Sequence, residues 1–171
     1  MEQDYLDQET EQLEKEVMQL VGFIIGKEKF GVDILSVQEI IRKTPITAVP
    51  NSPEFIEGVI NLRGSIIPVI DLRKRLNILK HRKEENNGEP VTWIIIIKVD
   101  ERVTGFIVDS VTKVLKIQRN TIEPPPDIVV AGLKSQYIHG VCEIDTGLLI
   151  LLDFSKILDI KEIGRLRDFD K

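Results

Sequence analysis

The sequence is poor in the residues that build disulfides, zinc sites and membrane spans. It contains one cysteine, Cys142, and two histidines, His81 and His139. A single cysteine cannot form an internal disulfide, and so few ligands do not supply a structural zinc site. The longest apolar run, residues 93–97, is far too short to span a bilayer, and no basic and apolar signal segment opens the chain. We therefore expect a soluble cytoplasmic protein without direct membrane insertion.

Aromatic residues and an excess of basic charge are also missing. Aromatic residues make up 5% of the chain, and the formal net charge is −5. Residues 1–16 carry seven acidic residues and one lysine, so the remaining body is close to neutral. A neutral body with few aromatic rings has neither the basic stripe nor the stacking platform of a nucleic-acid-binding protein. We predict that no nucleic acid binds and that residues 1–17 form an acidic flexible leader.

The residues that are abundant favour β-structure. The chain has 26 isoleucines and 16 valines but only two alanines. β-branched residues fit pleated sheets, whereas alanine is the best helix former. Apolar residues make up 42% and charged residues 30% of the chain, which is typical of a globular protein. We expect a mostly β fold with a few short helices.

An internal duplication organises the sequence. Residues 58–76 align without gaps on residues 140–158, with identities at five positions and mostly apolar pairs elsewhere. Upstream, residues 31–37 resemble residues 107–111, and both halves continue into a threonine- and proline-containing stretch. The chain is therefore predicted to contain two related halves, joined by a linker at about residues 81–90.

Each half contains five short apolar segments separated by turn residues, which is typical of a small barrel. We predict two packed SH3-like five-stranded β-barrels, at about residues 18–80 and 91–160, followed by a tail at 161–171. Whether strands exchange between the halves is left open. Asp71 and Asp153 follow strands and are predicted to cap short helices. The predicted strands are 19–25, 29–32, 37–42, 58–62, 65–70, 91–99, 103–108, 114–117, 140–144 and 148–152.

The sequence contains no recognisable catalytic or metal-binding motif. Residues 22–27 imitate a phosphate-binding loop, but the glycine spacing is one residue short and Glu28 replaces the magnesium-binding hydroxyl. Cys142 aligns with an isoleucine of the first half, which favours a buried thiol, and Trp93 is expected in the core. We predict no catalytic residue, no metal site and no cofactor. The alternative is an enzyme or small-molecule-binding protein that uses the cleft between the barrels.

The positions at which the two halves disagree are candidates for function. The stretch Asn61-Leu62-Arg63-Gly64 becomes Glu143-Ile144-Asp145-Thr146, so the apolar frame is kept while the charge at the turn changes sign. Arg63 is expected at a hairpin tip, where its guanidinium group is free for bidentate recognition, and Glu39 in the middle of a strand. These two residues could also form an ordinary exposed ion pair.

Residues 33–40 (DILSVQEI), 58–64 (GVINLRG) and 68–72 (PVIDL) resemble the CheW family of bacterial chemotaxis coupling proteins. The resemblance covers about residues 18–160, and the Asn-Leu-Arg-Gly turn is highly specific to that family. It implies a non-catalytic adaptor that joins chemoreceptors to the histidine kinase CheA.

The resemblance also implies roles for individual residues. It places Glu39, Arg63, Asn61 and Val114 on a groove that meets the cytoplasmic tips of methyl-accepting chemoreceptors. It assigns kinase binding or coupling to a second group of residues, comprising Val37, Gly58, Gly105, Val111 and Gly140. The protein would then be cytoplasmic and recruited to membrane chemoreceptor arrays.

Overall fold

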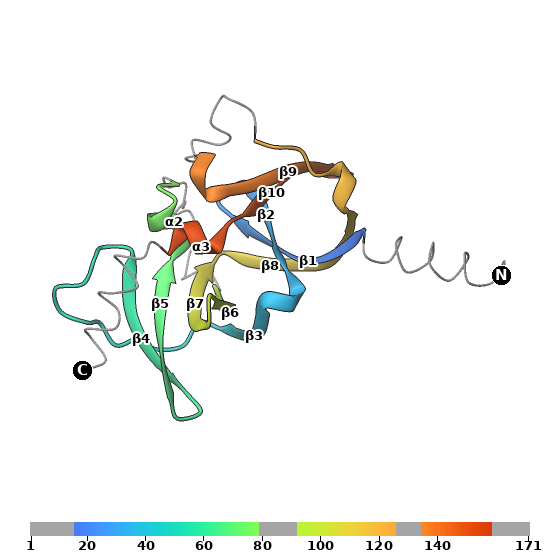
Figure 1. Ribbon diagram of the computed structural model, residues 1–171. Helices are drawn as coiled ribbons and strands as arrows, with labels where there is room; N and C mark the ends of the chain where they lie inside the picture. The colour runs from blue at the N-terminus through green and yellow to red at the C-terminus, as the bar shows by residue number, and fades with distance from the viewer. Residues whose placement is uncertain (1–15, 79–91, 126–134, 159–171) are drawn as a thin grey trace, which may run out of the picture.

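The computed structural model describes residues 16–78, 92–125 and 135–158 (Figure 1). Nearly all of the leader, the whole linker and the tail predicted at residues 1–17, 81–90 and 161–171 lie outside these ranges. The described part of the chain is dominated by strands and contains only short helices. The expected fold class, a mostly β protein with a few short helices, is confirmed.

All ten predicted strands are present. The largest difference is in the eighth strand, which begins at Ser110 rather than at residue 114. The strands of the first half are β1 (Val17–Ile25), β2 (Glu28–Asp33), β3 (Val37–Arg42), β4 (Ile56–Leu62) and β5 (Ser65–Asp71). Those of the second half are β6 (Trp93–Val99), β7 (Arg102–Val108), β8 (Ser110–Gln118), β9 (Ile138–Ile144) and β10 (Gly147–Leu152). The short helices are η1 (Ile34–Ser36), α2 (Leu72–Arg75), η2 (Arg119–Thr121), η4 (Ser135–Tyr137) and α3 (Phe154–Ile157).

The strands form two five-stranded sheets that exchange strands between the halves. One sheet has the order β8-β1-β2-β10-β9, and the other has the order β3-β6-β7-β5-β4. Each sheet thus combines the first two strands of one half with the last three of the other. The parallel pairs β10–β2 and β5–β7 join the halves. The strand exchange that the sequence left open therefore takes place, because strand partners are chosen by long-range packing rather than by nearness in sequence.

Both sheets curl in the same way. The chain beyond β3 returns to β4 through the bridge between Thr47 and Val59, and the chain beyond β8 returns to β9 through the bridge between Glu123 and Val141. The second bridge is the counterpart of the first, because Val59 and Val141 occupy matching positions in the duplication. In each sheet, the chain that continues from one edge strand therefore pairs with the edge strand on the opposite side of the sheet.

The apolar residues of the described ranges form three cores. The largest lies between the two sheets, and each sheet also encloses a smaller core of its own. The burial of β6 on both faces explains why its sequence is continuously apolar rather than alternating. Ile95 and Ile97 face the central core, while Ile94 and Ile96 face the smaller core of their own sheet. Neighbouring residues of a strand point to opposite faces, so a strand that is covered on both sides needs apolar residues throughout.

Trp93, expected in the core, is only half-buried at the start of β6. The guanidinium group of Arg42 on the neighbouring strand lies 5.5 Å from the centre of its ring. Trp93 therefore packs against the edge of the central core and receives a cation–π contact from outside it.

The predicted helix caps are confirmed. The Asp71 carboxylate accepts a hydrogen bond from the Arg73 amide at 2.9 Å. The Asp153 carboxylate accepts from the amides of Ser155 and Lys156 at 3.1 and 3.2 Å. Both side chains satisfy amides that have no partner within the short helices α2 and α3.

Arg75 contacts both halves of the chain, and it lies at a position where the two halves differ in sequence. Its guanidinium carbon lies 4.6 Å from the ring centre of Phe55 and 5.1 Å from that of Tyr137, two residues at matching positions in the two halves. Its Nε donates to the carbonyl oxygen of Ile157 at 2.9 Å. Ile157 is itself the counterpart of Arg75. One arginine therefore connects matching parts of both halves.

Candidate functional site

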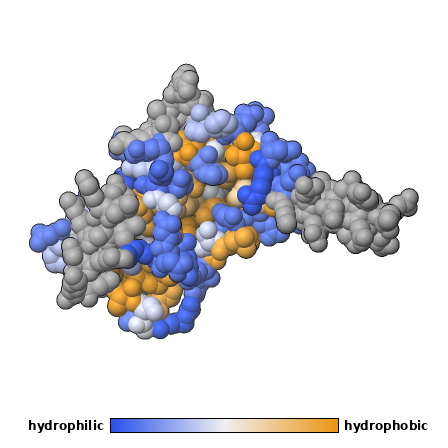
Figure 2. Space-filling view, viewed as in Figure 1, coloured by the Kyte–Doolittle hydropathy of each residue, from blue (hydrophilic) through white to orange (hydrophobic). Residues whose placement is uncertain are grey.

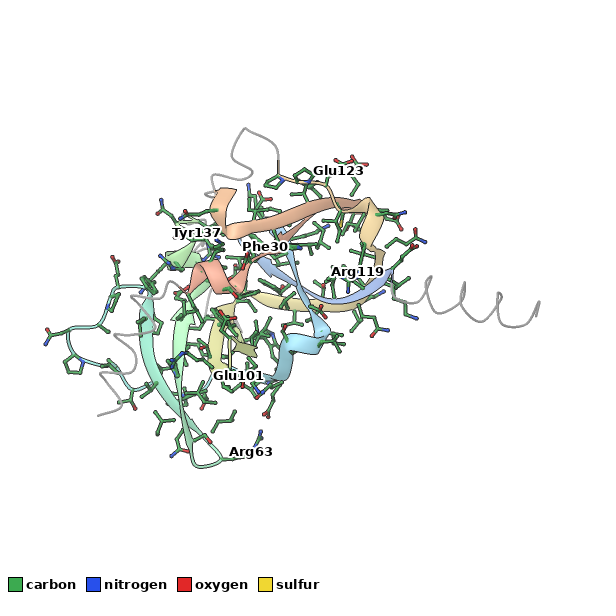
Figure 3. All side chains as sticks on the ribbon, in the orientation of Figure 1. Phe30, Arg63, Glu101, Arg119, Glu123 and Tyr137 are labelled. Carbon is green, nitrogen blue, oxygen red and sulfur yellow. The ribbon has the colours of Figure 1, made fainter. Side chains whose placement is uncertain are left out.

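The hairpin between β4 and β5 presents Arg63 at its tip, as the sequence predicts (Figure 3). Leu62 pairs with Ser65, so Arg63 and Gly64 form a two-residue loop. Both have positive φ angles, 51° and 89°, as the tight turn of a hairpin requires. The side chain of Asn61 supports the loop, because its Oδ1 accepts the Gly64 amide at 2.9 Å. A glycine fits such a backbone freely, whereas an arginine is held there at a cost.

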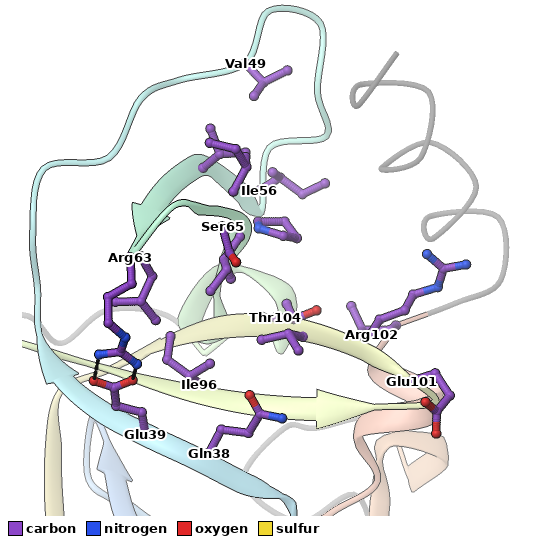
Figure 4. A pocket seen from close by; sticks show the side chains of 17 residues that line it. Gln38, Glu39, Val49, Ile56, Arg63, Ser65, Ile96, Glu101, Arg102 and Thr104 are labelled. Carbon is purple, nitrogen blue, oxygen red and sulfur yellow. Dashed lines mark hydrogen bonds and ion pairs between the residues drawn. The ribbon is translucent and has the colours of Figure 1, made fainter.

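The Arg63 side chain reaches across to Glu39 on β3 and forms a bidentate ion pair (Figure 4). The Arg63 Nη1 to Glu39 Oε1 distance is 2.9 Å. Arg63 remains largely open to solvent, with 71% of its side chain exposed, compared with 28% for Glu39. The hydrogen bond from Arg63 lowers the pKa of the Glu39 carboxyl, and the same contact raises the pKa of Arg63. The pair is therefore charged over the whole neutral range, and its exposed half faces outward.

A hollow of about 570 Å³ lies behind this ion pair (Figure 4). Its walls come from the β4–β5 hairpin, from β3 and from the β6–β7 hairpin. Arg63 and Glu39 stand at one end of the hollow, and Glu101 and Arg102 stand at the other. The apolar part of the lining comprises Val49, Ile56, Val59, Leu62, Ile66, Ile67, Pro68, Ile96, Val103 and Leu158.

Of the residues predicted to meet a receptor, Glu39, Asn61 and Arg63 come together here. Val114 lies on β8 of the other sheet, with 52% of its surface exposed, and does not line this hollow. The resemblance places Val114 with these residues on a groove between the barrels, and this assignment stays a prediction. The position of Val114 relative to Glu39 could not be predicted from the sequence alone, because β3 and β8 are edge strands of different sheets.

The residues predicted for kinase binding or coupling fall into two groups. Val37 on β3 and Val111 on β8 are partly buried, and both pack against the central core. Val37 pairs with Ile97 and Val111 pairs with Phe23 at the start of their strands. These two valines therefore occupy matching positions on the two edge strands.

The three predicted glycines lie where another part of the chain approaches closely. A Cβ at Gly58 would lie 2.0 Å from the carbonyl oxygen of Thr47. A Cβ at Gly140 would lie 2.5 Å from the side chain of Ile122, and one at Gly105 would lie 2.8 Å from that of Ile94. Their first role is thus to permit close packing.

A second exposed surface was missed by the sequence analysis. Leu35 in η1 is 89% exposed, and apolar surface is visible at η1 and on the β4–β5 hairpin (Figure 2). A hollow of about 510 Å³ adjoins it, with Val17 and Met18 of β1 on one side and Lys116 and Arg119 on another. Alternation of apolar residues could not have identified it, because a short 3₁₀ turn has no strand periodicity.

The described ranges contain no cluster of three or more histidine, cysteine, aspartate or glutamate side chains that could hold a metal ion. Cys142 is buried as predicted, and burial raises the pKa of its thiol. Within these ranges, no helix is both long and apolar enough to cross a membrane.

The fold and the exposed ion pair define a two-sheet β protein whose candidate site is a surface rather than an enclosed catalytic pocket. Residues 19–162 match the family model described as the CheW-like domain. The chain therefore belongs to the CheW-like family of chemotaxis signalling proteins.

Individual relatives agree with this assignment. The chain is 36% identical to the chemotaxis protein CheW of Treponema pallidum over 88% of each chain. It is 38% identical to the CheW of Klebsiella aerogenes, over 83% of this chain and 82% of the relative. The crystal structure of the scaffolding protein TtCheW from Thermoanaerobacter tengcongensis is similar with a TM-score of 0.74 and 36% identity, covering 85% of this chain and 90% of that one.

Proposed function

We propose that this protein is a non-catalytic adaptor that couples the cytoplasmic tips of methyl-accepting chemoreceptors to the histidine kinase CheA. It acts in the cytoplasm at membrane chemoreceptor arrays, by binding both proteins at once. Family membership and the chemotaxis relatives support the signalling role. The single observation that carries the receptor assignment is the exposed, bidentate Arg63–Glu39 pair at a hairpin tip.

The energetics of this pair favour recognition over stability. An exposed ion pair contributes only about 0–1 kcal/mol to folding. The positive φ angle of Arg63 works against that small gain. A pair that adds so little to the fold, yet fixes a planar guanidinium beside apolar surface, is well suited to contact a receptor helix. Asn61 positions the tip, and Val114 adds an apolar contact on the second sheet.

The coupling residues act in two ways in this proposal. Val37 and Val111 are partly exposed on the edge strands and connect the surface with the central core. A partner that binds an edge strand can therefore favour one packing of the sheets over another. Gly58, Gly105 and Gly140 influence coupling through the close packing that they permit.

The receptor assignment is tested by a pull-down with a receptor cytoplasmic hairpin and, separately, with the kinase. We expect Arg63→Ala to lose most receptor binding while its stability changes by no more than about 0.5 kcal/mol. Lys74→Ala is the matched control, because Lys74 forms another surface ion pair, with Glu57 at 2.6 Å, and neither residue lines the hollow. Normal receptor binding by a folded Arg63→Ala protein would refute the assignment.

A charge exchange separates recognition from simple support of the hairpin. The double variant Glu39→Arg with Arg63→Glu can restore the ion pair with the charges reversed. If the pair only holds the hairpin against β3, the double variant binds the receptor normally. If the receptor contacts these charges, as we propose, binding stays impaired although the pair is restored.

The alternative of an enzyme or small-molecule-binding protein receives less support. The hollow is large enough for a small ligand. However, Arg63 and Glu39, the charged groups at one end of the hollow, are bound to each other rather than directed at a common point inside.

A further inference from the structure

The duplication places an arginine at one position of the first half and a serine at the matching position of the second. Arg73 follows the cap of α2, and Ser155 is its counterpart in α3. Arg73 forms an ion pair with the carboxylate of Asp109, and the same carboxylate oxygen accepts the Gly26 amide at 2.7 Å. With only 14% of its side chain exposed, Arg73 fills the space between α2, the β1–β2 turn and the β7–β8 junction.

The space around Ser155 is open instead. A hollow of about 450 Å³ lies there, between η1, the end of β6 and the start of α3. The β6–β7 turn forms one wall of this hollow, just as the β1–β2 turn lies against Arg73. Asp100 of the β6–β7 turn occupies the position that Gly26 has in the β1–β2 turn. The lining comprises Val32, Asp33, Ser36, Ile97, Lys98, Val99, Asp100, His139, Leu152, Asp153, Phe154 and Ser155.

The charges around this hollow favour a cation. Asp33, Asp100 and Asp153 line it, with Lys98 as the one lysine or arginine of the lining. The Oδ1 atom of Asp33 accepts the Leu35 amide at 3.0 Å, and this leaves Oδ2 for a further donor. In the sequence, Asp33 aligns with Asp109, but the strand registers set Gly31 against Gly105 and therefore Leu35 against Asp109, so the two aspartates do not occupy the same place in the fold. Asp33, two residues before Leu35, is the carboxylate that lines this hollow beside η1.

We propose that this hollow is a socket for an arginine side chain of a partner protein. The chain itself shows the arrangement with Arg73, whose guanidinium group is held between a helix start, a hairpin turn and an aspartate. Arginine fits better than lysine, because a planar guanidinium group can bind two acceptors at once and is more weakly hydrated. The socket shares no lining residue with the hollow at Arg63, so it does not depend on the receptor assignment.

The probe for a first test is Nα-acetyl-arginine amide, titrated into the protein and followed by amide NMR shifts. We expect saturable shifts confined to the amides around Asp33, Asp100 and Ser155, and weaker binding of Nα-acetyl-lysine amide. Asp33→Asn should weaken arginine binding about two- to fivefold, the range expected for one exposed ion pair. Asp145→Asn is the control, because Asp145 is an exposed aspartate of the β9–β10 turn and lines neither hollow. Non-saturable shifts, or equal binding of the lysine probe, would overturn the proposal.

Filling the socket from within the chain is the second test. Ser155→Arg places an arginine where the first half has Arg73. We expect this variant to melt at a higher temperature than the native protein and to lose arginine-probe binding, while Ser155→Ala keeps it. If Ser155→Arg folds and still binds the probe with native affinity, the hollow is not the binding site.

Discussion

Replacement of Gly58 by alanine should be the most damaging single-methyl addition among the glycines considered. The φ angle of Gly58 is 148°, and a Cβ there would lie 2.0 Å from the Thr47 carbonyl oxygen. Thr47 and Val59 exchange two backbone hydrogen bonds of 2.9 Å, so a displaced Thr47 loses both. Two such bonds are worth about 1–3 kcal/mol and the backbone strain adds a similar amount, so we expect a loss of about 2–6 kcal/mol.

Urea unfolding followed by far-ultraviolet circular dichroism measures this loss. The expected value is a large fraction of the 5–15 kcal/mol that typically stabilises a domain. Gly64→Ala is the control, because φ is also positive there, at 89°, but no described atom would lie within 4 Å of its Cβ. It should cost only about 1–2 kcal/mol of backbone strain. A Gly58→Ala protein destabilised by less than Gly64→Ala would refute the reasoning and would favour a direct surface role for Gly58.

Three further predictions concern Asp71, Cys142 and Arg75, and each can be tested by urea unfolding. Burial raises the pKa of the Asp71 carboxyl, so the folded state binds a proton at this carboxyl more tightly than the unfolded state does. The native protein should therefore gain stability relative to Asp71→Asn as the pH falls from 7 towards about 4. Cys142→Ser should cost about 1–3 kcal/mol, because it buries a hydroxyl in an apolar core, and the native thiol should react slowly with a disulfide reagent. Arg75→Leu removes contacts with Phe55 and Tyr137 and should lower the urea midpoint by the equivalent of about 1–3 kcal/mol without changing the slope.

The candidate site could be predicted in part. The Asn-Leu-Arg-Gly stretch marked the hairpin tip, and the change of charge at this turn between the halves singled out Arg63. Their direct contact required the structure, because 24 residues separate them and no local pattern links a turn to the third strand. Leu35 was missed because a short 3₁₀ turn has no periodic pattern in the sequence. Its 89% exposure depends on which elements pack around η1.

The sequence by itself determined where the strands and the short capped helices lie. Alternating and continuous apolar segments located ten strands, the two matching aspartates located the helix caps, and the alignment of residues 58–76 with residues 140–158 predicted that the halves would resemble each other. These are properties of neighbouring residues, whose backbone preferences and side-chain directions are local. The tertiary structure alone decided that β1 and β2 join the last three strands of the second half, and that β6 and β7 join those of the first. Strand partners are selected by the burial of apolar faces over long distances in the chain, and two related halves offer nearly equivalent faces for that choice.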